Sequence, residues 1–142
     1  MLSLITAHQQ PGEPMNRTFN PKTVAPPLGA YSHAVEVPPG ARWLHIAGQV
    51  GVRPDGTMAK GAEAQCEQIW HNIVAILAIA GMAPRDLVRI NSFLTRPEDI
   101  AVARTVRAKY LEGHEPASTL LVVSRLAAPE LLMEIEAVAA KA

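Results

Sequence analysis

Apolar residues alternate with two carboxylates near the C-terminus. The spacing in residues 131–139 predicts a β-strand with one apolar face and with Glu134 and Glu136 on the other. Leu132 and Val138 flank the two carboxylates on their own face. A carboxylate among apolar neighbours is costly unless it is paired, hydrogen-bonded, protonated or turned toward a wet cleft. We therefore take both glutamates as candidate functional residues, the alternative being that they lie on a solvated sheet edge.

The segment before this strand is apolar on both faces from Leu120 to Val123. Such a run is typical of a strand in the middle of a sheet that is covered on both sides. Residues 127–130 then form a turn into the C-terminal strand.

Shorter alternating runs predict the other strands, which are a short edge strand at residues 17–19 and longer strands at 31–37, 42–49 and 87–94. The strands 31–37 and 42–49 are expected to form a hairpin, because Pro38-Pro39-Gly40 between them is a turn signal. Gly48 inside a strand predicts a bulge or a close approach to a ligand. The alternative is a glycine needed only for packing beside Trp43.

Helical spacing of apolar residues predicts helices at residues 62–80 and 97–111. In the second helix we expect Arg104, Arg107 and Lys109 to be solvated. The order β-β-α-β-α-β-β indicates an α+β domain. Two helices can cover only one face of its sheet, so the other face is expected to meet another copy of the chain.

Composition narrows the possible classes of protein. The 142 residues fit one domain, predicted over residues 16–142 after a flexible tail at 1–15. Thirteen basic residues balance thirteen acidic ones, so neither nucleic acid nor an anionic membrane is an expected partner. No apolar run reaches the ~18 residues of a membrane helix. The single cysteine, Cys66, fits a reducing, cytoplasmic compartment, and no zinc-site spacing is present.

Six short segments, taken in order, resemble the Rid family of imine and enamine deaminases, also called YjgF/YER057c/UK114. They are Gly29–Ala34, Ile46–Val50, the helix 65–81, Val88–Leu94, Pro116–Ser118 and Glu134–Ala139. The resemblance implies a chorismate-mutase-like protomer with two helices on one sheet face. It also implies a barrel-like homotrimer with clefts between subunits, a small-molecule ligand that can be anionic, and chemistry without a metal or organic cofactor.

Four positions match the residues that line the cleft in deaminating members of the family. Tyr31 matches a tyrosine, Ala47 and Gly48 match a backbone segment that contacts the substrate, and Glu134 matches a glutamate that holds the attacking water. The resemblance therefore implies that Glu134 and Tyr31 are catalytic and that Ala47 and Gly48 bind substrate.

Three further positions in the expected substrate-binding set depart from the family pattern. Ser118 stands where deaminases have the arginine that binds the substrate carboxylate, Leu120 where some have cysteine or threonine, and Arg104 where asparagine is usual. A unit-charge pair at ~4 Å is worth about 4 kcal/mol at an effective dielectric near 20, before desolvation costs. We therefore expect slow deamination of 2-iminopropanoate, unless Arg104 supplies a guanidinium from another wall of the cleft.

Three functions remain open from the sequence. The first is a Rid-type hydrolase acting on an imine, an enamine or a related metabolite. The second is a non-catalytic trimer that binds a metabolite, which the missing arginine favours. The third is a chaperone-like interaction module. The cost of Glu134 in an apolar strand favours the first, because ligand binding alone does not require that carboxylate.

Overall fold

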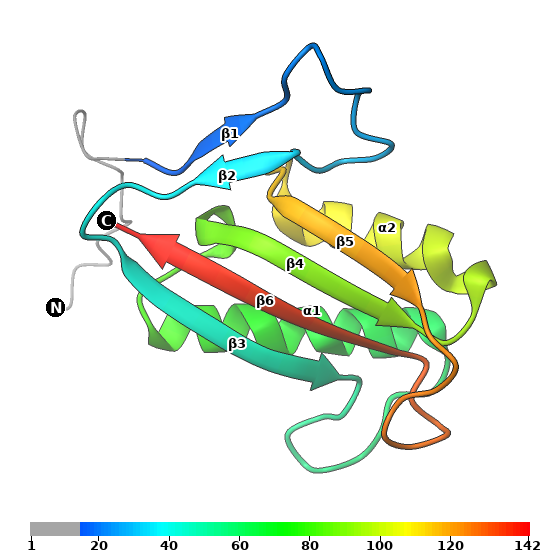
Figure 1. Ribbon diagram of the computed structural model, residues 1–142. Coiled ribbons are helices and arrows are strands. Elements are labelled where there is room, and N and C mark those ends of the chain that lie inside the picture. The colour runs from blue at the N-terminus through cyan, green and yellow to red at the C-terminus, as the bar shows by residue number, and fades with distance from the viewer. Residues whose placement is uncertain (1–14) are drawn as a thin grey trace, which may run out of the picture.

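Two helices lie against one face of a four-stranded sheet in the computed structural model, which describes residues 15–142 (Figure 1). The strands of this sheet are β3 (Arg42–Val50), β4 (Leu87–Leu94), β5 (Ala117–Val122) and β6 (Met133–Lys141). The helices are α1 (Ala62–Ile79) and α2 (Ile100–Leu111), with short 3-10 turns η1 (Pro84–Asp86) and η2 (Pro97–Asp99) before β4 and α2. The predicted arrangement of two helices on one face of an α+β sheet is confirmed.

The strands lie in the order β3-β6-β4-β5. β6 is antiparallel to both of its neighbours, whereas β5 is parallel to β4. The register aligns Ile46, Ala137 and Ile90, and all three are buried in the core beneath the helices. Because alternate residues of a strand face opposite ways, Glu134 and Glu136 lie on the face away from the helices. β6 is a central strand, so the two glutamates do not lie on a sheet edge.

Helix α1 supplies most of the helical part of the core. Its fully buried side chains are Cys66, Ile69, Trp70, Ile73 and Leu77, and Ile76 packs partly buried against them. The helix ends close to the predicted residue, since Ala80 caps it and Gly81 follows with a φ of 69°. That left-handed backbone is the usual reason for glycine after a helix.

Strand β5 is at the edge of the sheet, so the prediction of a central strand is wrong. Leu121 and Val122 are 49% and 44% exposed, although their neighbour Leu120 packs against the core. Apolar residues on both faces therefore do not reflect two covering layers within this chain. The pattern leaves a partly apolar sheet edge that one protomer does not cover.

The predicted hairpin of residues 31–37 and 42–49 is also wrong. Strand β2 (Ala34–Glu36) pairs with β1 (Arg17–Phe19), as a two-stranded ribbon separate from the main sheet (Figure 1). The prolines between β2 and β3 have no backbone N–H to donate to a ladder. The short edge strand predicted at residues 17–19 is confirmed. The tail predicted for residues 1–15 lies, apart from Met15, outside the described residues.

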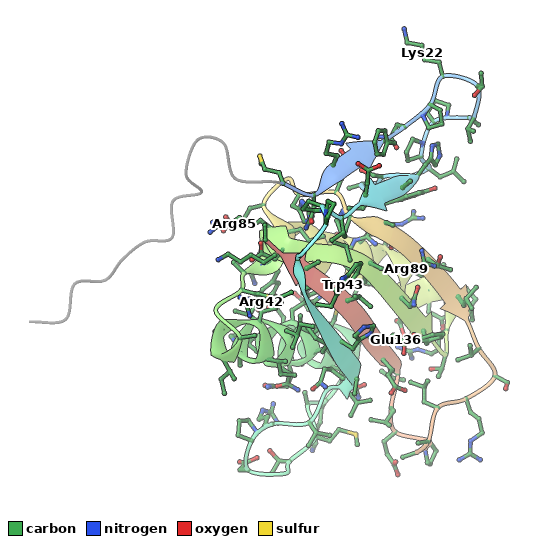
Figure 2. All side chains as sticks on the ribbon, turned by 60° about the vertical axis from the view of Figure 1, so that its left-hand side comes forward. Lys22, Arg42, Trp43, Arg85, Arg89 and Glu136 are labelled. Atoms are coloured by element: carbon green, nitrogen blue, oxygen red, sulfur yellow. The ribbon has the colours of Figure 1, made fainter. Side chains whose placement is uncertain are left out.

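The sheet face opposite the helices is open in one protomer. Trp43 on β3 is 55% exposed, and Figure 2 shows it on this face together with Arg89 and Glu136. In the part of the chain that the structure covers, no helix is long and apolar enough to span a membrane.

Candidate functional site

Glu134 and Gly48 are in direct contact on the open face. The pairing of β3 with β6 shifts between Ile46 and Gln49, so Gly48 lies in the irregularity that the sequence predicts. A Cβ atom at Gly48 would lie 2.1 Å from Oε1 of Glu134. Only glycine leaves room for the carboxylate here, so the backbone of β3 forms one wall of its position.

The Glu134 carboxylate is half-buried and makes no hydrogen bond or ion pair with any residue from 15 to 142. Glu136 on the same strand does have a partner, because it accepts a 3.1 Å hydrogen bond from Asn91 Nδ2. A carboxylate without a protein partner is available to bind a ligand or to accept a proton from water. Glu136 instead has a structural partner.

A shallow hollow of about 370 Å³ lies beside Glu136 in the middle of the open face. Its walls include His45, Ala47, Arg89 and Asn91. Arg89 donates a 2.9 Å hydrogen bond to Thr119 Oγ1, which ties β4 to the edge strand. Ala47 thus lies on the same face as Glu134. No three His, Cys, Asp or Glu side chains among residues 15–142 are grouped so that they could hold a metal ion.

Tyr31 lies near the β5 edge of the sheet, beside the start of that strand. Ser32 next to it donates from its backbone N to Pro116 O at 3.1 Å and from Oγ to Glu115 O at 2.6 Å. The Tyr31 hydroxyl accepts a 3.2 Å hydrogen bond from Leu28 N. These contacts fix Tyr31 next to the Pro116–Ser118 segment rather than next to Glu134.

Ser118 and Leu120 point to the helix side of the sheet. The register aligns them with Ile90 and Ser92 of β4, which are buried. Leu120 packs against the core, and Ser118 Oγ accepts a 3.0 Å hydrogen bond from Nη1 of Arg107. Both β5 residues of the predicted substrate-binding set therefore lie on the helix side of the sheet.

Arg107 is 7% exposed, so the prediction that it is solvated is wrong. Burial lowers the pKa of its guanidinium, and the neighbouring Arg104 lowers it further. The sequence held a signal for this position, because Arg107 follows the buried Ala103 by four residues and thus shares its face of the helix. Arg104 is exposed, and among the described residues it has no hydrogen bond or ion pair.

The candidate residues therefore form two groups. The first group is Ala47, Gly48 and Glu134 on the open face, and the second is Tyr31, Arg104, Arg107, Ser118 and Leu120 around α2 and the β5 edge. The strands β6 and β5 lie two places apart, which corresponds to about 10 Å across the sheet. Glu134 and Ser118 also lie on opposite faces. A single protomer does not bring the two groups together.

The fold is that of a small α+β protein, in which two helices cover one face of a mixed sheet. Its candidate polar site, the Glu134 carboxylate beside Gly48, lies on the other face. The family described as Endoribonuclease L-PSP matches residues 22–141. The RutC family protein PH0854 of Pyrococcus horikoshii is 37% identical over 117 residues, covering 81% of this chain and 90% of that protein. The chain belongs to the Rid (YjgF/YER057c/UK114) family.

Two further relatives are similar over most of the chain. The crystal structure of the Rid family protein YyfB from Yersinia pestis is similar with a TM-score of 0.78 at 39% identity, covering 87% of this chain and 97% of that one. A 2-iminobutanoate/2-iminopropanoate deaminase of Salmonella typhimurium is 27% identical over 131 residues, covering 89% of this chain and 99% of that protein. The resemblance inferred from the sequence segments is confirmed.

Proposed function

We propose that this protein is a Rid-type hydrolase that deaminates an imine, an enamine or a related small metabolite. The observation that carries the proposal is the Gly48–Glu134 contact, in which a half-buried carboxylate without a protein partner faces a position that has no side chain. The named activity of the Salmonella relative supports the reaction type.

Imine hydrolysis consumes one water molecule and releases ammonia. In the proposed reaction Glu134 accepts a proton from water while the water oxygen bonds to the imine carbon, and the imine nitrogen gains a proton. The carbon–nitrogen bond of this adduct then breaks, its hydroxyl proton passes to the leaving nitrogen, and a carbonyl compound remains. Glycine at position 48 lets the substrate approach the β3 backbone, and the Tyr31 hydroxyl provides a further hydrogen-bonding group. None of these steps requires a metal ion or an organic cofactor.

The complete site is proposed to lie between two copies of the chain. The separation of Glu134 from Tyr31 and Ser118 within one protomer supports this, because a neighbouring copy can bring the second group to the first. The open face with Trp43 and the exposed apolar edge of β5 provide surfaces for assembly. We infer a barrel-like homotrimer of the Rid type, working in the cytoplasm.

The description of the matching family names an endoribonuclease. We favour a small-molecule substrate because thirteen basic and thirteen acidic residues leave no net charge for binding a polyanion. Ser118 at the position of the family arginine favours a second candidate function, which is binding of a metabolite without catalysis.

Replacement of Glu134 by glutamine distinguishes these functions. We expect Glu134→Gln to lower the rate of ammonia release by about 100-fold or more, since a general base is lost. The matched control is Glu136→Gln, which removes the same charge from the same face and keeps an oxygen to accept the bond from Asn91. Substrates are 2-iminopropanoate and 2-iminobutanoate generated in the assay, together with imines that have larger side chains.

The outcomes separate clearly. Selective loss in Glu134→Gln supports the hydrolase. An equal loss in both variants assigns the effect to the sheet surface rather than to a catalytic base. If the wild type accelerates hydrolysis of no imine but binds the corresponding oxo acids, the binding function replaces the proposed one.

A further inference from the structure

Arg107 is a buried cation without an anion. Of its five N–H donors, the structure accounts for one, the bond from Nη1 to Ser118 Oγ. Within residues 15–142 no carboxylate forms an ion pair with it, although ion pairs are present elsewhere on the surface. Its charged neighbour on α2 is Arg104, which has the same sign.

The remaining nearby ionisable group does not neutralise Arg107. Cys66 on α1 is fully buried, and burial raises the pKa of its thiol to about 12 even though Arg107 favours the thiolate. Cys66 is therefore uncharged at neutral pH. Among residues 15–142, only His33 Nδ1 and Trp70 Nε1 are buried side-chain polar atoms without a partner, so the N–H groups of Arg107 that make no bond remain accessible from outside the chain. A largely buried guanidinium without a counter-ion is still costly to the fold. An anion from outside the chain would supply the missing counter-charge and acceptors.

We propose that Arg107, together with Ser118 on β5, forms the anion-binding part of the substrate site. The guanidinium comes from the helix and reaches the strand position where deaminases of the family have arginine. It can hold a carboxylate through two parallel hydrogen bonds, which is the geometry that a planar guanidinium favours. Ser118 leaves space for this arrangement, because a larger residue there would occupy the position of the Arg107 side chain.

This assignment rests on the proposed function and names its substrate class, which is an imine or enamine that carries a carboxylate. Arg104 adds positive charge next to Arg107 and strengthens the preference for an anion. The guanidinium comes from α2 instead of from the strand position of Ser118 itself.

The test compares an acid with its uncharged isostere in calorimetric titrations of the full chain. The probes are 2-oxobutanoate and 2-oxobutanamide, which differ only in the carboxylate. We expect the wild type to bind the acid about 10- to 100-fold more tightly, the difference expected for charge-assisted hydrogen bonds. Arg107→Gln should abolish this preference. Arg107→Lys, which keeps the charge in a fold-compatible side chain, should retain part of it.

Two further variants complete the design. Arg42→Gln is the matched control, because it removes one positive charge from β3, three strands away from β5, and should preserve the preference. The exchange Arg107→Ser with Ser118→Arg returns the guanidinium to the strand. We expect this double variant to prefer the acid again, which no purely structural role of Arg107 predicts.

Equal binding of acid and amide by the wild type overturns the proposal. So does an unchanged preference in both Arg107→Gln and Arg107→Lys. If Arg107→Gln instead dissociates the oligomer in sedimentation and the wild type does not distinguish the probes, Arg107 pairs with a carboxylate of another copy and the proposal is wrong. Failure of the hydrolase function is separate, since it appears as unchanged hydrolysis in Glu134→Gln whatever the Arg107 variants do.

Discussion

Glu134 and Arg107 are both charged side chains that face a small residue, but the fold supports them in opposite ways. Glu134 projects from the central strand β6 onto an open face, where Gly48 gives it room. Arg107 projects from α2 beneath the helices, where it meets Ser118 at the sheet edge. The Glu134 carboxylate is only half-buried, because no helix covers this face of the sheet. The Arg107 side chain is buried, because it lies between α2 and the sheet.

This difference indicates which element controls each half of the proposed site. The position of Glu134 depends on the pairing of β3 with β6, and so on backbone hydrogen bonds within the sheet. The position of Arg107 depends on how α2 packs against α1 and β5. Changes in one half should therefore leave the other half of the same protomer intact, and the halves should meet only through assembly.

Mixing two inactive variants is the strongest test of this division. Glu134→Gln and Arg107→Gln should each be nearly inactive alone. After the two are unfolded and refolded together, sites that combine Glu134 of one copy with Arg107 of another should recover activity, at roughly a quarter of sites for random mixing. Ammonia release from an imino acid that the wild type hydrolyses measures this recovery. The double variant Glu134→Gln/Arg107→Gln, mixed with wild type, is the control for dilution.

Absence of recovery in assembled mixtures would mean that both residues serve one site within a protomer. It would also contradict the inference that one protomer cannot combine the two residues, which rests on the two strand places and opposite faces that separate Glu134 from Ser118.

Two closely packed glycines, Gly48 and Gly51, distinguish function from stability in the Glu134 half. At Gly48 a Cβ would meet only the flexible end of Glu134, whereas at Gly51 it would lie 2.7 Å from the Cα atom of Gln65 on α1. Gly48→Ala should therefore lower turnover about 10-fold or more by displacing the carboxylate, at a small cost in stability. Gly51→Ala should lower the free energy of unfolding by about 1–3 kcal/mol. Urea unfolding and hydrolysis assays on both variants give the comparison, which fails if Gly48→Ala loses stability and keeps its turnover.

The Glu134 half could be predicted from the sequence, because its signals are local. Alternation shows that Glu134 shares a face with apolar residues, and glycine inside a strand indicates a bulge. Both features are present in the structure. The helices could be predicted for a similar reason, since the stripe of α1 repeats at helical spacing.

The Arg107 half could not be predicted in the same way. A helical arginine is usually solvated, and only the packing of α2 on β5 decides that Arg107 is buried. The edge position of β5 also depends on a non-local choice, namely its parallel pairing with β4 rather than with its neighbour in sequence, β6. Local patterns describe the faces of an element, whereas its partners are set by the whole chain.

The smallest expected effect concerns the contact that holds α2 in place. Tyr110, three residues after Arg107, donates a 2.6 Å hydrogen bond from its hydroxyl to Oε2 of Glu67 on α1. Tyr110→Phe should lower the free energy of unfolding by about 0.5–1.5 kcal/mol, the usual contribution of such a bond. It should also weaken carboxylate binding slightly, because Arg107 lies on the same helix, while the Glu134 half is unaffected.

The pH dependence of stability provides the matching measurement. Burial raises the pKa of Tyr110 to about 12, and its bond to Glu67 adds to this rise, whereas a tyrosine in the unfolded chain titrates near ~10. Between these two values the unfolded chain binds fewer protons at this residue than the folded chain, so the contribution of Tyr110 is complete below pH ~10 and is lost as pH rises toward 12. Urea unfolding from pH 9 to pH 12 should show a steeper loss of stability in the wild type than in Tyr110→Phe. Parallel curves for the two proteins would mean that the Tyr110–Glu67 bond does not hold α2, and Arg107 would then need another anchor.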